Sequence, residues 1–522
     1  MLVRRSPFGE NRVGSMPVLN EGQTTLTLIA RVGLTNFQLL QCVMAVVFLV
    51  YAADGAMLPG VFKAIEEKFR GATPVSLGSI LLAEALCHSM AVLVWGIFAD
   101  RHCKLTLLQY AMVCWGLLTL ATAFVDRIGT LIIVRSLAGI VGAGLGPLSQ
   151  GLIGAVCPPR ERGRAFGFLI ACGAAGHICG LMLAGTTSHN TAIGGWRGSF
   201  AIFALATLLV AYMLALVREE VDNGFFAQSR TWAKLESRRY AIEDSSTKKQ
   251  LTDLLSNFVL IARRRSFVVL VLQGAFASTT VKALTYQVMW FQYLGFGDVR
   301  ASTITSAVPL GSMFGALLSG HISDALAVRF PNHGRIFFAQ AADLVKLVIY
   351  ATTFHVCAAP DPNSSYTFAL VFGLSFLSGV FCIMAYAGVV KPLFAEIVPE
   401  FVIAQVIAMA AAIDGAFSAV AGLPLVGYIT EHVFGYEHTS LMIADMPTKL
   451  RVANAAALGK AITVVSVGST LLTVCAFGFL HWTYPADRDA SIAAKNAGLE
   501  GRILSYESTS DYEGDDAQEA SR

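Results

Sequence analysis

Two charged residues interrupt long apolar stretches at positions where they could form a pair. Asp54 lies before the end of the stretch 36–58, and Arg135 lies after the start of the stretch 130–155. At a helical rise of 1.5 Å per residue, both would lie roughly 7 Å from the same end of the two stretches. Protonation of Asp54 would release Arg135, so the pair could serve as a proton-coupling switch. A permanent structural salt bridge is the alternative.

Five further ionisable residues within apolar stretches could line a polar cavity, because intramembrane charges normally face a cavity or a partner. Glu84 and His88 are four residues apart and therefore share one helix face. His88 and His177 could sense protons or bind a polar head group, and hydrogen-bonded packing is the alternative. Lys282 could attract an anionic or phosphate-bearing substrate, and Asp414 could balance its charge.

The motifs of several other chemistries are missing from the sequence. No Cys and His spacing matches a zinc site, no Gly-rich loop ends in Gly-Lys-Ser/Thr, and no Gly-x-Ser-x-Gly elbow occurs. We therefore expect no metal, no cofactor, no catalytic residue, no ATP-driven step and no nucleic-acid partner. The chain is predicted not to be an enzyme.

Two apolar stretches end in the same pattern, Gly-x-x-x-Asp, 224 residues apart. Such a carboxylate can accept hydrogen bonds from the start of a neighbouring helix, and a following Arg can bind an acidic partner. We expect a cytosolic gate here, stronger in the first copy because the second lacks the Arg. The residues are Gly96, Asp100, Arg101 and Lys104 in the first copy and Gly320 and Asp324 in the second.

The composition indicates that these stretches lie in a lipid membrane. Hydrophobic residues make up 55% of the 522 residues, charged residues only 14%, and the mean hydropathy is +0.61. Apolar runs near 20 residues are long enough to cross a bilayer. We predict an all-α membrane protein with twelve transmembrane helices in two six-helix bundles. The predicted spans are 36–58, 76–99, 105–125, 130–155, 164–187, 197–217, 267–294, 300–323, 336–358, 366–390, 401–430 and 457–482.

The distribution of basic residues predicts the orientation. With both termini in the cytosol, the cytosolic segments hold most of the Lys and Arg, including ten between positions 218 and 265. We expect a multi-pass protein of the plasma membrane or a lysosome-like endomembrane, with a glycosylation sequon at Asn363 on the non-cytosolic side. The predicted parts are a cytosolic N-terminal segment (1–35), a six-helix bundle (36–217), a cytosolic linker with an interfacial helix (218–266), a second six-helix bundle (267–482) and a disordered acidic cytosolic tail (483–522).

Glycines in the fifth and eleventh spans support an internal repeat. Small residues let membrane helices approach closely, and close-packed or flexible helices suit two halves that rock against each other. Static packing is an equally good interpretation. The matched residues, at a constant offset of 242, are Gly173, Gly180 and Gly185 and then Gly415, Gly422 and Gly427.

Several of these segments resemble one family of membrane proteins. The sequence from Gly96 to Lys104 resembles the loop motif of the major facilitator superfamily, and Pro158 to Arg164 resembles its loop after the fourth helix. Tyr51-Ala-Ala-Asp54 and Val134-Arg135-Ser-Leu-Ala-Gly139 resemble the spinster-like branch. Gly142 stands where that branch has a Glu in its fourth helix.

The resemblance implies a secondary active transporter that works by alternating access. Members of the spinster-like branch are similar to exporters of lysophospholipids and sphingolipids. The resemblance therefore implies a proton-coupled carrier of an amphipathic or lipid-like molecule. A transporter of a sugar, amino acid or organic anion stays open, as does a membrane sensor that transports nothing. The expected partners are the substrate, protons and membrane lipids, and we expect a monomer.

Overall fold

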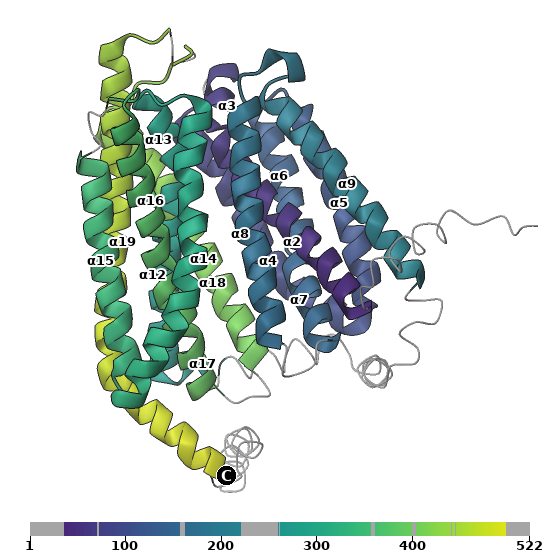
Figure 1. Ribbon diagram of the computed structural model, residues 1–522, viewed down its shortest axis with the longest axis vertical. Helices are drawn as coiled ribbons and strands as arrows, with labels where there is room; N and C mark the ends of the chain where they lie inside the picture. Colours follow the sequence, from purple (N-terminus) through teal and green to yellow (C-terminus); the bar gives the residue numbers. More distant parts are fainter. Residues whose placement is uncertain are drawn as a thin grey trace, which may run out of the picture.

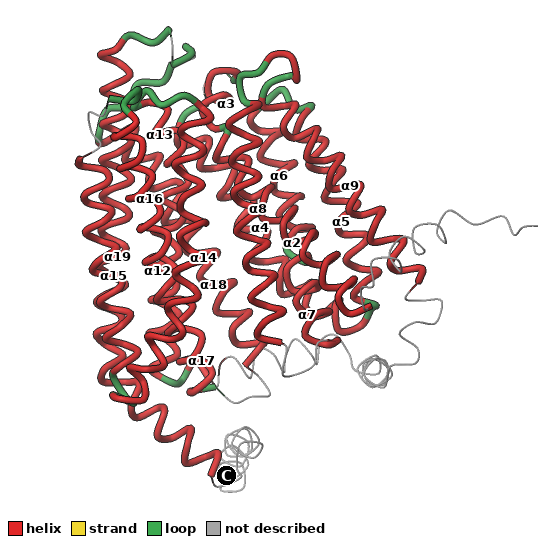
Figure 2. Tube along the Cα trace, viewed as in Figure 1, coloured by secondary structure: helices red, strands yellow, loops and turns green. Residues whose placement is uncertain are grey.

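The computed structural model describes residues 36–69, 72–156, 162–220, 259, 261–356, 361–398, 403–439, 441–443 and 445–496. In these ranges the chain forms helices and connecting loops and no strand (Figure 2). Twelve of the helices are long and apolar enough to cross a membrane. The predicted fold class, an all-α membrane protein, is confirmed.

The chain forms two halves that stand side by side (Figure 1). The first half contains α2 (Asn36–Gly60), α3 (Phe62–Lys68), α4 (Pro74–Arg101), α5 (Lys104–Ala123), α6 (Ile128–Gly142), α7 (Leu145–Val156), α8 (Arg162–Thr187), the 3-10 helix η1 (Thr191–Ile193) and α9 (Trp196–Glu220). The second half contains α12 (Arg265–Ala283), η3 (Leu284–Tyr286), α13 (Gln287–Tyr293), α14 (Asp298–Arg329), α15 (Gly334–Val356), α16 (Ser365–Ala385), η4 (Tyr386–Val390), α17 (Lys391–Ile397), α18 (Ile403–Tyr428), η5 (Ile429–Val433) and α19 (Thr448–Asn496).

The two halves repeat the same packing. In the first half α2 packs on α8, α4 on α6 and α5 on α9, and in the second half α12 packs on α18, α14 on α16 and α15 on α19. The halves meet through α4 with α18 and through α8 with α14. These are equivalent pairs, since each joins the second helix of one half to the fifth helix of the other.

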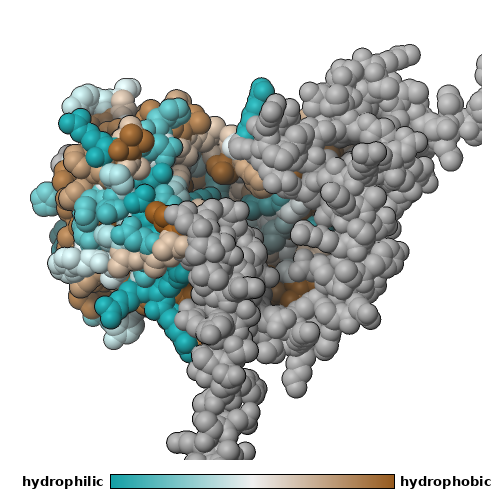
Figure 3. Space-filling model, turned by 90° about the horizontal axis from the view of Figure 1, so that it is seen from below, coloured by the Kyte–Doolittle hydropathy of each residue, from teal (hydrophilic) through white to brown (hydrophobic). Residues whose placement is uncertain are grey.

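We call the end of the molecule that carries α3, η1 and the segment 434–447 the upper end, as in Figure 1, and the opposite end the lower end. Seen from below, the described part of the second half presents hydrophilic surface at the lower end (Figure 3). In this half Arg335 binds Asp324 at 2.9 Å, and Arg488 lies 3.6 Å from Glu396.

Two differences from the predicted boundaries have physical reasons. α3 occupies residues predicted to form a loop, and its seven residues are too short for a periodic pattern. The fourth span is broken between α6 and α7, where Gly144 lies against Trp95 and a Cβ would approach its ring to 2.5 Å. Residues 1–35 and the interfacial helix of the linker lie outside the described residues.

The predicted boundary of the tail at residue 483 is wrong, because α19 continues to Asn496. Tertiary contacts hold this extension: Tyr484 is buried and donates to Glu396, and the Asp487 carboxylate accepts from the backbone of Ser266 at 2.8 Å. Arg488 donates to Asn332 at 2.7 Å. Polar composition alone does not reveal such partners.

Candidate functional site

The centre of the first half holds a buried arginine between two carboxylates. Arg135 on α6 donates to Asp54 on α2 at 2.9 and 3.3 Å and to Glu84 on α4 at 2.7 and 3.0 Å. We call these three residues the arginine cluster. The exposed fraction is 0% for the Arg135 side chain, 3% for Asp54 and 20% for Glu84. Two carboxylates therefore share one guanidinium, and Glu84 is the more accessible of the two.

The sequence around each residue explains this placement. Thr73 and Ser76 cap α4 reciprocally and Pro74 starts it, which fixes where the helix begins. Gly139 then lets α6 approach, because a Cβ there would lie 2.4 Å from the Glu84 carbonyl oxygen. The structure pairs Asp54 with Arg135, as their depths in the sequence suggested. The bond from Arg135 to Glu84 was not predicted.

Four of the five predicted cavity residues lie near one another, and Asp414 lies apart from them. His88 accepts or donates a hydrogen bond at 3.0 Å with Tyr51 on α2. The charge of Lys282 on α12 acts on Glu84, His88 and His177, so these groups of both halves face a shared internal region. This region adjoins the arginine cluster and extends the candidate site across the boundary between the halves.

Asp414 does not join this group. It lies against Gly274 on α12, where one carboxylate oxygen is buried without a hydrogen-bond partner. Lys282 instead packs on Gly422, which lies eight residues further along α18. At 1.5 Å per residue, Asp414 is therefore about 12 Å below Gly422 along the helix. The structure therefore does not bring Asp414 to Lys282 as a balancing charge.

The predicted cytosolic gate is described only in part. Gly96 and Lys104 lie at the lower end, where the Lys104 stem covers Gly151 on α7. The side chains of Asp100 and Arg101 lie outside the described residues. In the second copy, Gly320 is on α14 and Asp324 binds Arg335 within the same half, with 67% of the Asp324 side chain exposed. The gate function of these residues stays a prediction.

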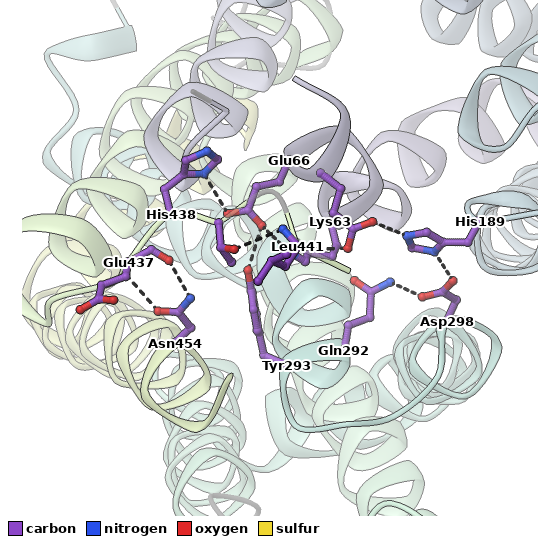
Figure 4. A network of polar contacts seen from close by, with 12 residues as sticks. Lys63, Glu66, His189, Gln292, Tyr293, Asp298, Glu437, His438, Leu441 and Asn454 are labelled. Atoms are coloured by element: carbon purple, nitrogen blue, oxygen red, sulfur yellow. Dashed lines mark hydrogen bonds and ion pairs between the residues drawn. The ribbon is translucent and has the colours of Figure 1, made fainter. Parts of the chain in front are cut away.

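A polar network at the upper end joins the two halves (Figure 4). Glu66 on α3 is fully buried, binds Lys63 at 3.0 Å and accepts hydrogen bonds from Tyr293 at 2.8 Å and from Tyr436. His438 lies 3.5 Å from the same carboxylate. Lys63 and Glu66 belong to the first half and the other three residues to the second, so these contacts exist only while the halves meet.

A second branch of the network is centred on a histidine. His189 bridges Glu67 of the first half at 2.7 Å and Asp298 of the second half at 2.5 Å. Gly194 and Gly195, with φ of 84° and 64°, turn the chain back after His189. We call Lys63, Glu66, Glu67, His189, Tyr293, Asp298, Tyr436 and His438 together the upper-end network.

The network carries stable charges. Hydrogen bonds to Asp298 and Glu67 raise the pKa of His189 to about 10, so its imidazolium persists through neutral pH. Burial alone would raise the pKa of the Glu66 carboxyl, but the hydrogen bond from His438 and the charge of Lys63 outweigh burial and hold this pKa below its usual value. The hydrogen bond to Glu66 raises the pKa of His438 in turn.

Sequence reasoning missed all eight residues of the upper-end network. The spacing Lys63-x-x-Glu66-Glu67 indicates a helical ion pair, but nothing local marks its partners, which come from segments up to 372 residues away. Among the described residues, the hydrogen bonds and ion pairs between the halves all lie toward the upper end. The described molecule is therefore closed at this end.

The glycine repeat marks equivalent contacts. A Cβ at Gly180 would lie 2.1 Å from the Ala53 carbonyl on α2, and one at Gly422 would lie 2.7 Å from Lys282 on α12. Both contacts are within a half. Gly185 approaches α14, whereas Gly427 approaches α4, so the last pair of glycines joins the halves at the upper end.

Comparison with known proteins agrees with this architecture. The sequence profile of the Major Facilitator Superfamily matches residues 44–342. The chain is 28% identical over 216 residues to the 4-hydroxybenzoate transporter PcaK of Acinetobacter baylyi, covering 40% of this chain and 42% of the relative. It is 26% identical over 177 residues to the puromycin resistance protein pur8 of Streptomyces alboniger, covering 34% of each. The chain thus matches less than half the length of these two relatives.

Solved structures extend the likeness to nearly the whole fold. A bacterial homologue of the human lysosomal transporter Spinster, in an inward-facing and unoccupied conformation, superposes with a TM-score of 0.69 at 17% identity, covering 87% of this chain and 98% of that chain. A D-xylose–proton symporter superposes with a TM-score of 0.60 at 15% identity, covering 83% and 96%. The predicted resemblance is confirmed at the level of the fold.

Proposed function

Because the chain belongs to the Major Facilitator Superfamily, whose members are transporters rather than enzymes, we propose that it is a proton-coupled secondary transporter of amphipathic or lipid-like molecules. Lysophospholipids and sphingolipids are the substrate types we favour. The observation that carries the proposal is the sharing of Arg135 between Asp54 and Glu84. One guanidinium neutralises one carboxylate, so the other is available to take up a proton.

We propose that Glu84 exchanges the proton and that Asp54 holds Arg135. Glu84 is 20% exposed and faces the region of Lys282, whereas Asp54 is almost fully buried. Protonation of Glu84 would remove the negative charge that strengthens two of the four hydrogen bonds that hold Arg135, and this would shift the balance between conformations. The preserved bonds to Asp54 would keep the arginine neutralised.

We further propose that Lys282, His88 and His177 receive the anionic or polar head group of the substrate. Lys282 acts on both histidines and on Glu84, and its ammonium suits a phosphate or carboxylate. Apolar side chains of α4, α8 and α18, such as Met90 and Phe417, are exposed and would suit the hydrocarbon part.

We propose that the lower end faces the cytosol. The linker between the halves and its ten Lys and Arg residues connect at this end, and basic loops are retained on the cytosolic side. A molecule closed at the upper end is then open toward the cytosol. In this orientation Asn363 is on the non-cytosolic side, as its use for glycosylation requires.

A small organic anion without a hydrocarbon tail is the second candidate substrate. It is supported by the relative from Acinetobacter, which is named for transport of 4-hydroxybenzoate. Both candidates would bind Lys282 in the same way. Only the lipid-like substrate would also need an apolar surface for its hydrocarbon part.

Uptake into liposomes tests both candidates. The full-length protein is reconstituted, a pH gradient is imposed, and uptake of a lysophospholipid is compared with uptake of 4-hydroxybenzoate. We expect gradient-driven lysophospholipid uptake that loses its pH dependence in Asp54→Asn and Glu84→Gln. Asp489→Asn, an exposed change of the same charge, serves as the control. Unchanged pH dependence in both cluster variants would refute proton coupling, and uptake of 4-hydroxybenzoate alone would identify the second candidate.

A further inference from the structure

A groove on the second half lies apart from the arginine cluster. It is lined by residues of α13, α15 and α19 and by Phe434 near the upper end, and its volume is about 760 Å³. This volume is within the range of roughly 300–1,000 Å³ that is usual for small-molecule sites. α15 and α19 lie on the side of the second half that points away from the first half (Figure 1). The groove therefore faces the surrounding lipid.

The walls of the groove are apolar. The rings of Trp290 and Phe354 pack at 4.8 Å between centroids, and Trp290 donates its indole N–H to the Ala455 carbonyl at 3.1 Å. Gly459 allows this position, because a Cβ there would lie 2.6 Å from the indole nitrogen. Val464, which is 52% exposed, continues the apolar surface along α19. A hydrocarbon chain fits such a surface, since none of the described residues that line it has a buried polar side-chain atom without a hydrogen-bond partner.

Two basic side chains line the same groove. Lys460 is exposed on α19, three residues inside the predicted span 457–482, with its Nζ 5.9 Å from the centre of the Phe434 ring. Among the described residues, no carboxylate forms an ion pair with Lys460. His355 is the last residue of the membrane-crossing part of α15. A lysine in a membrane span normally has a partner or reaches the interface, and Lys460 near the end of its span can therefore bind an anionic group from outside the chain.

We propose that this groove binds an anionic membrane lipid. The head group would lie on Lys460 and His355 at the upper boundary of the bilayer, and one acyl chain would follow the exposed apolar surface of Ala456 and Val464, which covers the buried rings of Trp290 and Phe354. Basic pockets between membrane helices bind acidic head groups in this way on the cytosolic side of membranes, and we propose the same contact for this groove at the upper end. The proposal does not depend on the transported substrate or on proton coupling, because the groove and the arginine cluster share no residue.

Native mass spectrometry of the full-length protein in detergent tests the site with two lipids of equal chain length. We expect phosphatidylglycerol to bind more tightly than phosphatidylcholine. Lys460→Gln should weaken phosphatidylglycerol binding about fivefold and leave phosphatidylcholine unchanged. Lys449→Gln is the matched control, since Lys449 is exposed on the same helix and does not line the groove.

A second variant tests the groove without changing charge. Ala456 is exposed and lines the groove, so Ala456→Trp should fill it and reduce binding of both lipids, while thermal unfolding shows that the fold is intact. Equal binding of the two lipids to the native protein would overturn the proposal, as would an equal loss in Lys449→Gln. Unchanged lipid binding in Ala456→Trp would also overturn it. If that variant instead abolishes a dimer, the occupant is a second copy of the chain and not a lipid.

Discussion

The substitution Glu66→Gln should shift the protein toward a state that is open at the upper end. Glu66 in the first half is fully buried and receives hydrogen bonds from Tyr293 and Tyr436 of the second half, with His438 at 3.5 Å. Separation of the halves breaks these contacts and exposes the carboxylate to water. The contacts therefore stabilise the closed upper end relative to the open one.

The size of the effect follows from the number and kind of contacts. A hydrogen bond to a charged group contributes about 1.5–3 kcal/mol. The glutamine keeps one acceptor oxygen but loses the charge, and Lys63 keeps only Glu67, at 3.7 Å, as an acidic neighbour. We expect the closed state to lose about 2–4 kcal/mol, which changes the ratio of closed to open molecules by roughly 30-fold to 900-fold.

Distance measurements between spin labels test this prediction. Labels at Thr191 in the first half and Tyr366 in the second half, both exposed at the upper end, report its opening on a background with the native cysteines replaced. Glu66→Gln should add a longer distance to the distribution. Glu437→Gln, with the same change of charge on an exposed residue nearby, should not. Identical distributions for the native protein and Glu66→Gln, or an equal effect of the control, would refute the reasoning.

Three further predictions concern pH, packing and a buried ion pair. Closure of the upper end should retain the His189 contribution fully below pH 6.5, the usual pKa of histidine, and lose it progressively between pH 6.5 and about 10, so a rise from pH 6 to pH 8 should increase the share of open molecules in the label distances. Gly185→Ala should open the upper end in the same measurement, because its Cβ would lie 2.4 Å from Ser302 of the other half. Gly180→Ala places its clash inside one half, so it should lower the thermal unfolding temperature instead. Asp343→Asn should destabilise the fold by about 3 kcal/mol, since it leaves Lys346 buried without its partner at 2.6 Å, and Asp343→Leu combined with Lys346→Met should restore the unfolding temperature.

Much of the fold was predictable because the membrane imposes it. Each span needs about 20 apolar residues, so the twelve spans are visible in the sequence without any alignment. Depth is predictable for the same reason, since the rise per residue converts a position in a span into a distance from its end. The conversion places Asp54 and Arg135 at the same depth in their spans, and the structure joins them by an ion pair.

Rotation about each helix axis was not predictable in the same way. Glu84 appeared in the sequence as a cavity residue, and only the contact of Gly139 with the Glu84 backbone turns it toward Arg135. The partner proposed for Lys282 was wrong because Asp414 lies two turns lower on α18 than the contact of Gly422. The upper-end network was invisible because it joins α3, which is too short for a periodic pattern, to loop residues and to the ends of α13 and α14, far away in the sequence.

Charge balance connects the two parts of the proposed mechanism. The arginine cluster contains two carboxylates and one guanidinium, and Lys282 supplies the second positive charge that acts on Glu84. In our proposal an anionic head group that binds Lys282 takes this compensation away and leaves excess negative charge beside Glu84. Uptake of a proton at Glu84 then restores the balance, because an unpaired charge in a region of low dielectric is costly. A neutral amphiphile would leave Lys282 available to Glu84, so the coupling we propose requires a substrate that carries a negative charge.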